Sequence, residues 1–176
     1  KWDGSPALIF GRNSTGEVVI TDKSGFGAKG YDGKARSAGQ LEKMLAARNP
    51  NDPDRARYAA AMAGLWPAIA KAIPTDLRGY YQGDLLWSKT PPIDNGSFVF
   101  KPNKITYRIP VESPLGQKIA ASDVGLVVHG FFSDESQAEP QPITDVKALQ
   151  GNPSLVVLGA EMPEVAAQKS PDRKSV

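Results

Sequence analysis

Cysteine is absent from the 176 residues, and histidine occurs once, at His129. The first absence excludes a disulfide framework, a thiol nucleophile and a cysteine-ligated zinc site. The second excludes a metal site built from several histidines and disfavours a Ser-His-Asp hydrolase. No apolar run approaches the ~20 residues that a membrane-spanning helix needs, so we expect no membrane partner. With 21 basic and 19 acidic residues, the net charge alone gives no reason to expect a nucleic-acid partner.

Glycine and proline are abundant, with 17 and 15 residues, and imply many turns. Apolar runs bounded by turn-forming residues predict strands at 5–11, 16–21, 77–87, 97–100, 105–109, 125–132 and 155–158. Apolar residues at three- and four-residue spacing predict helices between residues 37 and 74, and a short helix at 115–121. Two strands, then helices, then many strands favour an α+β fold with antiparallel sheets over alternating β-α-β units.

Three residues define the predicted boundaries of the helices. Ser37 is a suitable N-cap, and Pro53 suits the first turn of a second helix. Pro67 should kink or split the apolar stripe that runs from Tyr58 to Ile73. The segments without a predicted element are a glycine-rich loop at 22–33, a polar loop at 137–142 and a disordered tail at 168–176.

The first four residues, Lys1-Trp2-Asp3-Gly4, precede the first predicted strand. Lys-x-Asp-Gly before an apolar strand resembles the nucleotidyl-attachment motif of the covalent nucleotidyltransferases, which include ATP-dependent DNA ligases, RNA ligases and mRNA capping enzymes. The resemblance implies that Lys1 attacks the α-phosphate of ATP and holds AMP through a phosphoramidate bond. A lysine attacks as the neutral amine, which a low-dielectric or cationic setting favours. Asp3 and Gly4 would then lie beside the nucleotide.

Later segments resemble further motifs of this superfamily, in the same order along the chain. Lys23 takes the place of a basic residue that precedes a turn. Asp84 takes the place of the acid of the third motif, which binds the ribose or acts through the metal. Phe100 takes the place of the aromatic residue that stacks on adenine, with Phe98 as the second choice. His129 takes the place of the basic residue that ends the fourth motif.

The chain departs from the superfamily pattern at two points. Val124 stands where the fourth motif has a metal-linked glutamate, and Asp123, one residue earlier, would face the other side of a strand. The fifth motif, a strand with Lys-x-Lys, is not recognisable after Phe132. The alternative is therefore a catalytically inactive ligase-like fold that acts as a nucleic-acid-binding or structural protein, for example a viral one.

The residues taken singly also leave simpler roles open. Asp84 can be a solvated acid, and His129 can be a strand histidine with its hydrogen bonds satisfied. Core packing explains Phe100 as well as base stacking does, and Lys23 can belong to a solvated basic loop.

The resemblance implies an α+β fold whose antiparallel sheets form a nucleotide-binding cleft. The adenylation-like domain would span 1–160, with a helical insertion at 36–74 and a polar tail at 161–176. ATP and Mg²⁺ would be the cofactors, with Asp84 as a metal ligand, and DNA or RNA would be the partner. We expect a cytoplasmic protein, or a phage protein acting in the host cytoplasm. We also expect the chain to form the central part of a nucleotidyltransferase domain.

Overall fold

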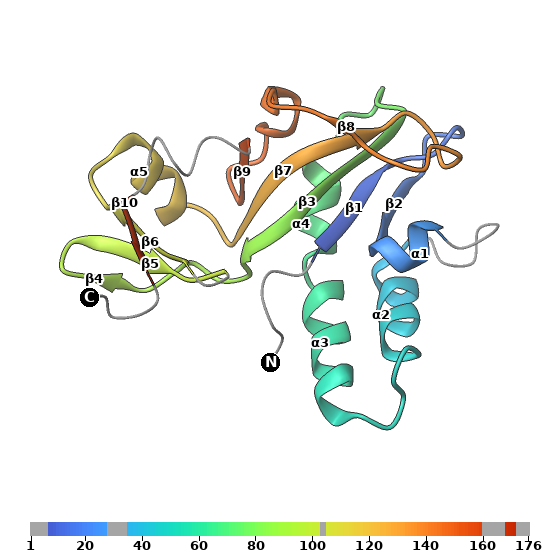
Figure 1. The fold of residues 1–176 in the computed structure, drawn as a ribbon, viewed down its shortest axis with the longest axis horizontal. Coiled ribbons are helices and arrows are strands. Elements are labelled where there is room, and N and C mark those ends of the chain that lie inside the picture. Colours follow the sequence, from blue (N-terminus) through green and yellow to red (C-terminus); the bar gives the residue numbers. More distant parts are fainter. Residues whose placement is uncertain (1–6, 28–34, 103–104, 160–167, 172–176) are drawn as a thin grey trace.

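A computed structural model describes residues 7–27, 35–102, 105–159 and 168–171 (Figure 1). The protein is α+β, as predicted, with two β-sheets and several helices. Within the described ranges no helix is both long and apolar enough to cross a membrane.

The larger sheet contains β1 (Ala7–Arg12), β2 (Val18–Thr21), β3 (Gly79–Trp87), β7 (Val124–Phe132), β8 (Gln141–Pro142) and β9 (Leu155–Gly159). Its strand order is β2-β1-β3-β7-β8, and β9 pairs with the first half of β7. The neighbours are antiparallel except for β7 and β9, which run parallel. A parallel pair needs a long connection, and the chain between them supplies one, with the short 3-10 helix η1 (Lys147–Leu149).

Three helices, α2 (Ala38–Ala46), α3 (Pro53–Ala63) and α4 (Trp66–Ala72), lie between β2 and β3 in the sequence. Ser37 caps α2, because its Oγ accepts a hydrogen bond of 3.1 Å from the Gln40 N–H. Asp52 caps α3 through its side chain, and Pro53 opens that helix. The apolar stripe splits, with Pro67 in the first turn of α4, so the predicted break is confirmed. Figure 1 shows α2 and α3 side by side at the sheet.

The main hydrophobic core lies between these helices and one face of the larger sheet. Its buried side chains include Leu8, Phe10, Ile20, Leu41, Leu45, Met62, Ile69, Leu85, Leu126, Val128, Leu155 and Val157. Successive residues of a strand point to opposite faces. Ile9 and Val19 therefore point to the other face, where they form a smaller cluster with Tyr80 and Phe132.

A short helix, α1 (Lys23–Gly27), covers this second cluster, so the prediction of a loop at residues 23–27 was wrong. The Asp22 carboxylate accepts a hydrogen bond of 2.8 Å from the Gly25 N–H and so caps the turn. The Phe26 ring is buried, with its centroid 5.1 Å from that of Tyr80 and 4.6 Å from that of Phe132. Burial of this one aromatic ring explains why a glycine-containing segment becomes helical.

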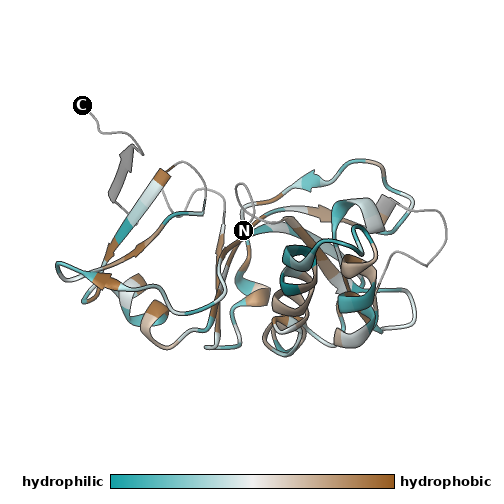
Figure 2. Ribbon diagram, turned by 90° about the horizontal axis from the view of Figure 1, so that it is seen from below, coloured by the Kyte–Doolittle hydropathy of each residue, from teal (hydrophilic) through white to brown (hydrophobic). Residues whose placement is uncertain are grey.

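The smaller sheet has the order β10-β6-β5-β4. Its elements are β4 (Ile93–Asp94), β5 (Ser97–Phe100), β6 (Ile105–Pro110) and β10 (Gln168–Pro171), and the helix α5 (Pro114–Ala120) packs beside it. Trp87 of β3 and Val156 of β9 join its core, so the two sheets share a hydrophobic contact. Figures 1 and 2 show the smaller sheet beside the larger, helix-covered one.

Two further segments differ from the sequence prediction. Residues 168–171, predicted as part of a disordered tail, form β10 and pair antiparallel with β6. Gln141 and Pro142, predicted as loop, form β8 at the edge of β7. Both strands are short and polar, so their local sequence carries little strand signal, and pairing with a stronger neighbouring strand defines them.

Candidate functional site

A break in the pairing of β3 with β7 brings Asp84 and His129 together. Two consecutive residues of β3 pair with Gly130 and with Val128, so His129 between them is the extra residue of a β-bulge. The His129 Nε2 lies 3.3 Å from the Asp84 Oδ2. Bulges re-aim a side chain in this way and are frequent next to active sites. Two residues singled out from the sequence as nucleotide contacts therefore form one ion-pairing unit.

Gly83 explains why the bulge forms at this position. A Cβ at Gly83 would lie 2.2 Å from the Val127 carbonyl oxygen, which is closer than any side chain tolerates. β3 and β7 therefore approach each other closely only because glycine precedes Asp84.

The pairing of β1 with β3 and β2 defines which side chains share a face with Asp84. Ala7, the first described residue, is the register partner of Asp84. Ile9 pairs with Gln82 on one side and with Thr21 on the other. Because directly opposite residues point to the same face, Asp84 and Gln82 share a face with Ile9, which belongs to the second cluster. Asp84 and Gln82 therefore lie on the face away from the main core.

Gln82 is a candidate site residue that the sequence prediction missed. The residue is 8% exposed, and its side chain makes no hydrogen bond with the described residues. Buried polar side chains are hydrogen-bonded in the large majority of cases, so an unpartnered carboxamide indicates a place for a ligand atom. The available signal was the i, i+2 spacing of Gln82 and Asp84 within an apolar strand, which places both on one face.

Burial raises the pKa of Asp84, and the neighbouring His129 acts in the opposite direction by favouring the carboxylate. The two side chains are 36% and 39% exposed for Asp84 and His129, respectively, so the pair stands at the surface of the sheet rather than within it. A half-buried acid whose basic neighbour is within hydrogen-bonding reach can bind a hydroxyl, a phosphate-bound cation or a proton.

The other predicted site residues lie apart from this pair or beyond the described ranges. Phe100 is 8% exposed, and its ring stacks on Tyr107 and meets Trp87 edge-on, at 5.5 Å and 4.7 Å between centroids. Its role in base stacking stays a prediction. Lys23 is exposed at the first position of α1. The predicted nucleotide contacts Lys1, Asp3 and Gly4 lie outside the described residues.

The donor set is compatible with a magnesium ion only if a substrate supplies most of its ligands. The described residues contain no group of three or more acidic, histidine or cysteine side chains that could hold a metal. Mg²⁺ is commonly bound through one or two carboxylates together with substrate phosphates and water. Asp84 supplies one such carboxylate. Val124 is 3% exposed, lies in the main core and adds no ligand.

Comparisons with known proteins identify a family but no activity. The model of a protein family described as "Family of unknown function (DUF6267)" matches residues 1–175. No curated protein matches the chain, and no solved structure matches it.

Proposed function

The chain belongs to the DUF6267 family, and we propose from its own residues that it is a ligase-like adenylyltransferase that forms a lysyl-AMP intermediate for joining nucleic-acid ends. The observation that carries the proposal is the juxtaposition at the start of β1. Ala7 lies opposite Asp84, and Lys1 stands only six residues before Ala7 in the sequence. In the sequence, the segment that resembles the attachment motif therefore immediately precedes the strand residue that pairs with Asp84.

The roles of the described residues follow from their chemistry. The Asp84 carboxylate accepts a hydrogen bond from a ribose hydroxyl or contacts a magnesium ion carried by the phosphates. His129 positions Asp84 at 3.3 Å and offers a donor to a phosphate oxygen. Gln82, whose buried carboxamide has no partner among the described residues, hydrogen-bonds the nucleotide. Mg²⁺, when bound, neutralises charge that develops on the phosphates.

The proposed reaction has three steps, and each of them is a substitution at phosphorus. The Lys1 amine attacks the α-phosphorus of ATP, a nitrogen–phosphorus bond forms, and pyrophosphate leaves with the electrons of the broken phosphoanhydride bond. An oxygen of a 5′-phosphate of DNA or RNA then attacks the phosphorus of the AMP, a phosphoanhydride bond forms, and the nitrogen–phosphorus bond breaks, which releases the Lys1 amine. A 3′-hydroxyl displaces the AMP and closes the backbone.

Adenylylation of the full chain with ATP labelled at the α-phosphate tests the first step directly. We expect a covalent label that depends on Mg²⁺, is absent from Lys1→Ala and is retained by the matched control Lys43→Ala, which changes an exposed lysine of α2. Gln82→Leu, of similar size and without the carboxamide, should label about fivefold to tenfold more slowly, because a lost hydrogen bond costs about 1–1.5 kcal/mol. Label on the Lys1→Ala chain would refute the role of Lys1.

A second candidate is a ligase-like protein that binds nucleic acid without catalysis. Val124 favours it, because this residue is buried with Leu126 and Val128 where an active ligase carries an acid. Asp123 is exposed, outside β7, and does not replace that acid on the strand. Absence of label together with salt-dependent binding of a fluorescent oligonucleotide would support this candidate over the enzyme.

A further inference from the structure

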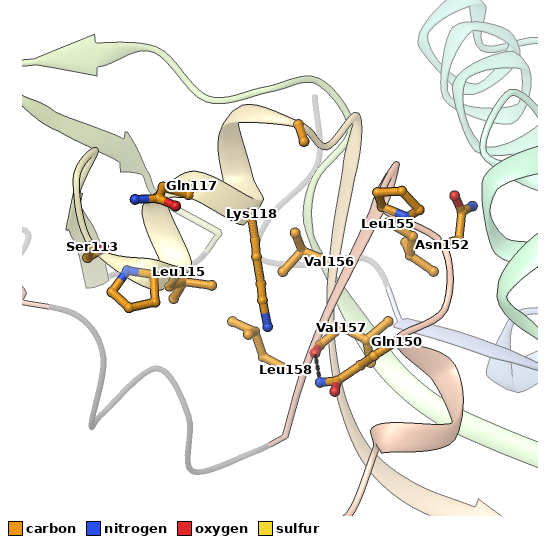
Figure 3. A pocket seen from close by; sticks show the side chains of 13 residues that line it. Ser113, Leu115, Gln117, Lys118, Gln150, Asn152, Leu155, Val156, Val157 and Leu158 are labelled. Atoms are coloured by element: carbon orange, nitrogen blue, oxygen red, sulfur yellow. Dashed lines mark hydrogen bonds between the residues drawn. The ribbon is translucent and has the colours of Figure 1, made fainter.

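A pocket of about 880 Å³ lies between α5 and β9 (Figure 3), and neither Asp84 nor His129 lines it. Its volume falls within the ~300–1,000 Å³ that is usual for small-molecule sites. Residues from both hydrophobic cores line it, since Leu155 belongs to the main core and Leu115 to that of the smaller sheet. None of the residues discussed for nucleotide binding takes part.

The wall of the pocket is mainly aliphatic. Leu115 of α5 packs in the same core as Val156 and Leu158 of β9, whereas Leu155 lines the pocket from the strand face that points to the main core. All four residues are buried. This wall of the pocket is therefore formed by the hydrophobic cores and not by a polar surface. An apolar body of a ligand would gain dispersion contacts and remove this surface from water.

One cation reaches into this aliphatic surrounding. The Lys118 side chain extends from α5 toward Gln150 and Leu158 (Figure 3). Within the described ranges, Lys118 makes no ion pair. The other polar side chains on this side already have partners: Asn152 donates to the Ala68 carbonyl at 3.0 Å, and Gln150 donates to the Val157 carbonyl at 2.9 Å. Lys118 is therefore the group that selects the charge of a ligand.

The edge of β9 in the pocket does not favour a peptide strand. Strand addition relies on free backbone donors and acceptors along an edge. Here the Leu155 N–H donates to the Asn152 carbonyl at 3.0 Å, and the Val157 carbonyl accepts from Gln150. With two of its backbone groups occupied, β9 presents side chains and few pairing sites, which suits a compact molecule.

We propose that the pocket between α5 and β9 binds a small apolar monoanion, with its hydrocarbon body against Leu115, Val156 and Leu158 and its acid group at Lys118. The site is independent of the proposed nucleotide chemistry, because it shares no residue with the Asp84–His129 pair.

Titration of the full chain with 2-naphthoate, followed by backbone-amide NMR shifts, tests the proposal. The uncharged isostere 2-naphthamide has the same shape without the charge. We expect 2-naphthoate to shift amides at 113–121 and 150–158, and to bind about threefold to fivefold more tightly than 2-naphthamide, which is the upper part of the range for a partly exposed ion pair. Lys118→Met should abolish this preference while keeping an aliphatic stem, and the control Lys147→Met should retain it.

A blocking variant separates the pocket from non-specific adsorption. Ala121 is exposed and lines the pocket, so Ala121→Trp should fill the entrance and weaken both compounds at least about tenfold without unfolding the chain. Shifts confined to other residues, equal binding of the two compounds, or binding unchanged in Ala121→Trp would each overturn the proposal.

Discussion

Replacement of Asp84 by asparagine separates a functional role of this residue from a structural one. The substitution keeps the shape of the side chain and removes its charge. Among the described residues, the only ion pair of Asp84 is the one with His129, at 3.3 Å. If the pair serves to hold the nucleotide, Asp84→Asn should abolish adenylylation while leaving the fold nearly as stable as before.

The expected change in stability follows from the exposure of the pair. Two unit charges separated by 3.3 Å attract each other by about 1.3 kcal/mol in the dielectric of water. This attraction exists only when His129 is protonated. The side chains are 36% and 39% exposed, so solvent screening and the loss of side-chain freedom reduce the net gain. We therefore expect Asp84→Asn to change the free energy of unfolding by less than about 1 kcal/mol.

The pH dependence of that change has a defined sign. Burial raises the pKa of Asp84 in the folded protein. The folded chain therefore keeps this proton to a higher pH than the unfolded chain, and the contribution of Asp84 to stability falls as the pH rises from the ordinary aspartate value through the raised pKa. Asp84→Asn removes this fall. The unfolding free energy of the variant minus that of the unmodified chain should increase with pH across the same window.

Urea unfolding followed by tryptophan fluorescence at about pH 4 and about pH 7 measures both quantities. Asp76→Asn, at an exposed acid, is the matched control. A loss above about 2 kcal/mol in Asp84→Asn, or a stability difference that decreases with pH, would refute the reasoning. Full adenylylation by a stable Asp84→Asn chain would remove Asp84 from the site.

Three other substitutions test the architecture that positions the site. Ser37→Ala should lower the unfolding free energy by about 1 kcal/mol in urea melts, because α2 loses its N-cap, and Ser37→Asp should restore it. Arg12→Met should cost about 2 kcal/mol, since the guanidinium donates to three backbone carbonyls, two of them just after α4; an unchanged urea midpoint would contradict this. Gly125→Ala places a Cβ 2.4 Å from the Trp87 ring. It should lower the free energy of unfolding by about 1–3 kcal/mol and alter the near-ultraviolet circular dichroism of the tryptophan. The control Gly39→Ala, whose Cβ would lie in open space, should do neither.

Elements with strong local signals were predictable from the sequence. Ser37 caps α2, Pro67 lies in the first turn of α4, and residues 97–100 form β5 as expected. The hairpin from β4 to β5 was not predicted, although its Asn95-Gly96 turn is a local signal; both residues adopt positive φ, at 50° and 76°, as such a turn requires. These features depend on neighbours in the chain, which is why pattern and turn chemistry suffice.

Elements that depend on distant partners were not predictable in the same way. α1 forms because Phe26 packs on Tyr80 and Phe132, which lie far along the chain. β9 runs parallel to β7, whereas the sequence predicted antiparallel sheets. β10 depends on hydrogen bonds to β6, since its own residues are polar. In each case a tertiary contact outweighs a weak local preference.

For the candidate site, the sequence by itself determined the chemical groups: an acid at Asp84, the single imidazole at His129 and a lysine motif before the first strand. Only the tertiary structure decided that Asp84 and His129 meet, and that Gln82 beside them is buried. The physical reason is strand register. Side chains alternate between the two faces of a strand with a period of two. The extra residue at His129 therefore moves every later side chain of β7 to the opposite face of the sheet. No local sequence pattern shows where such an extra residue will be inserted.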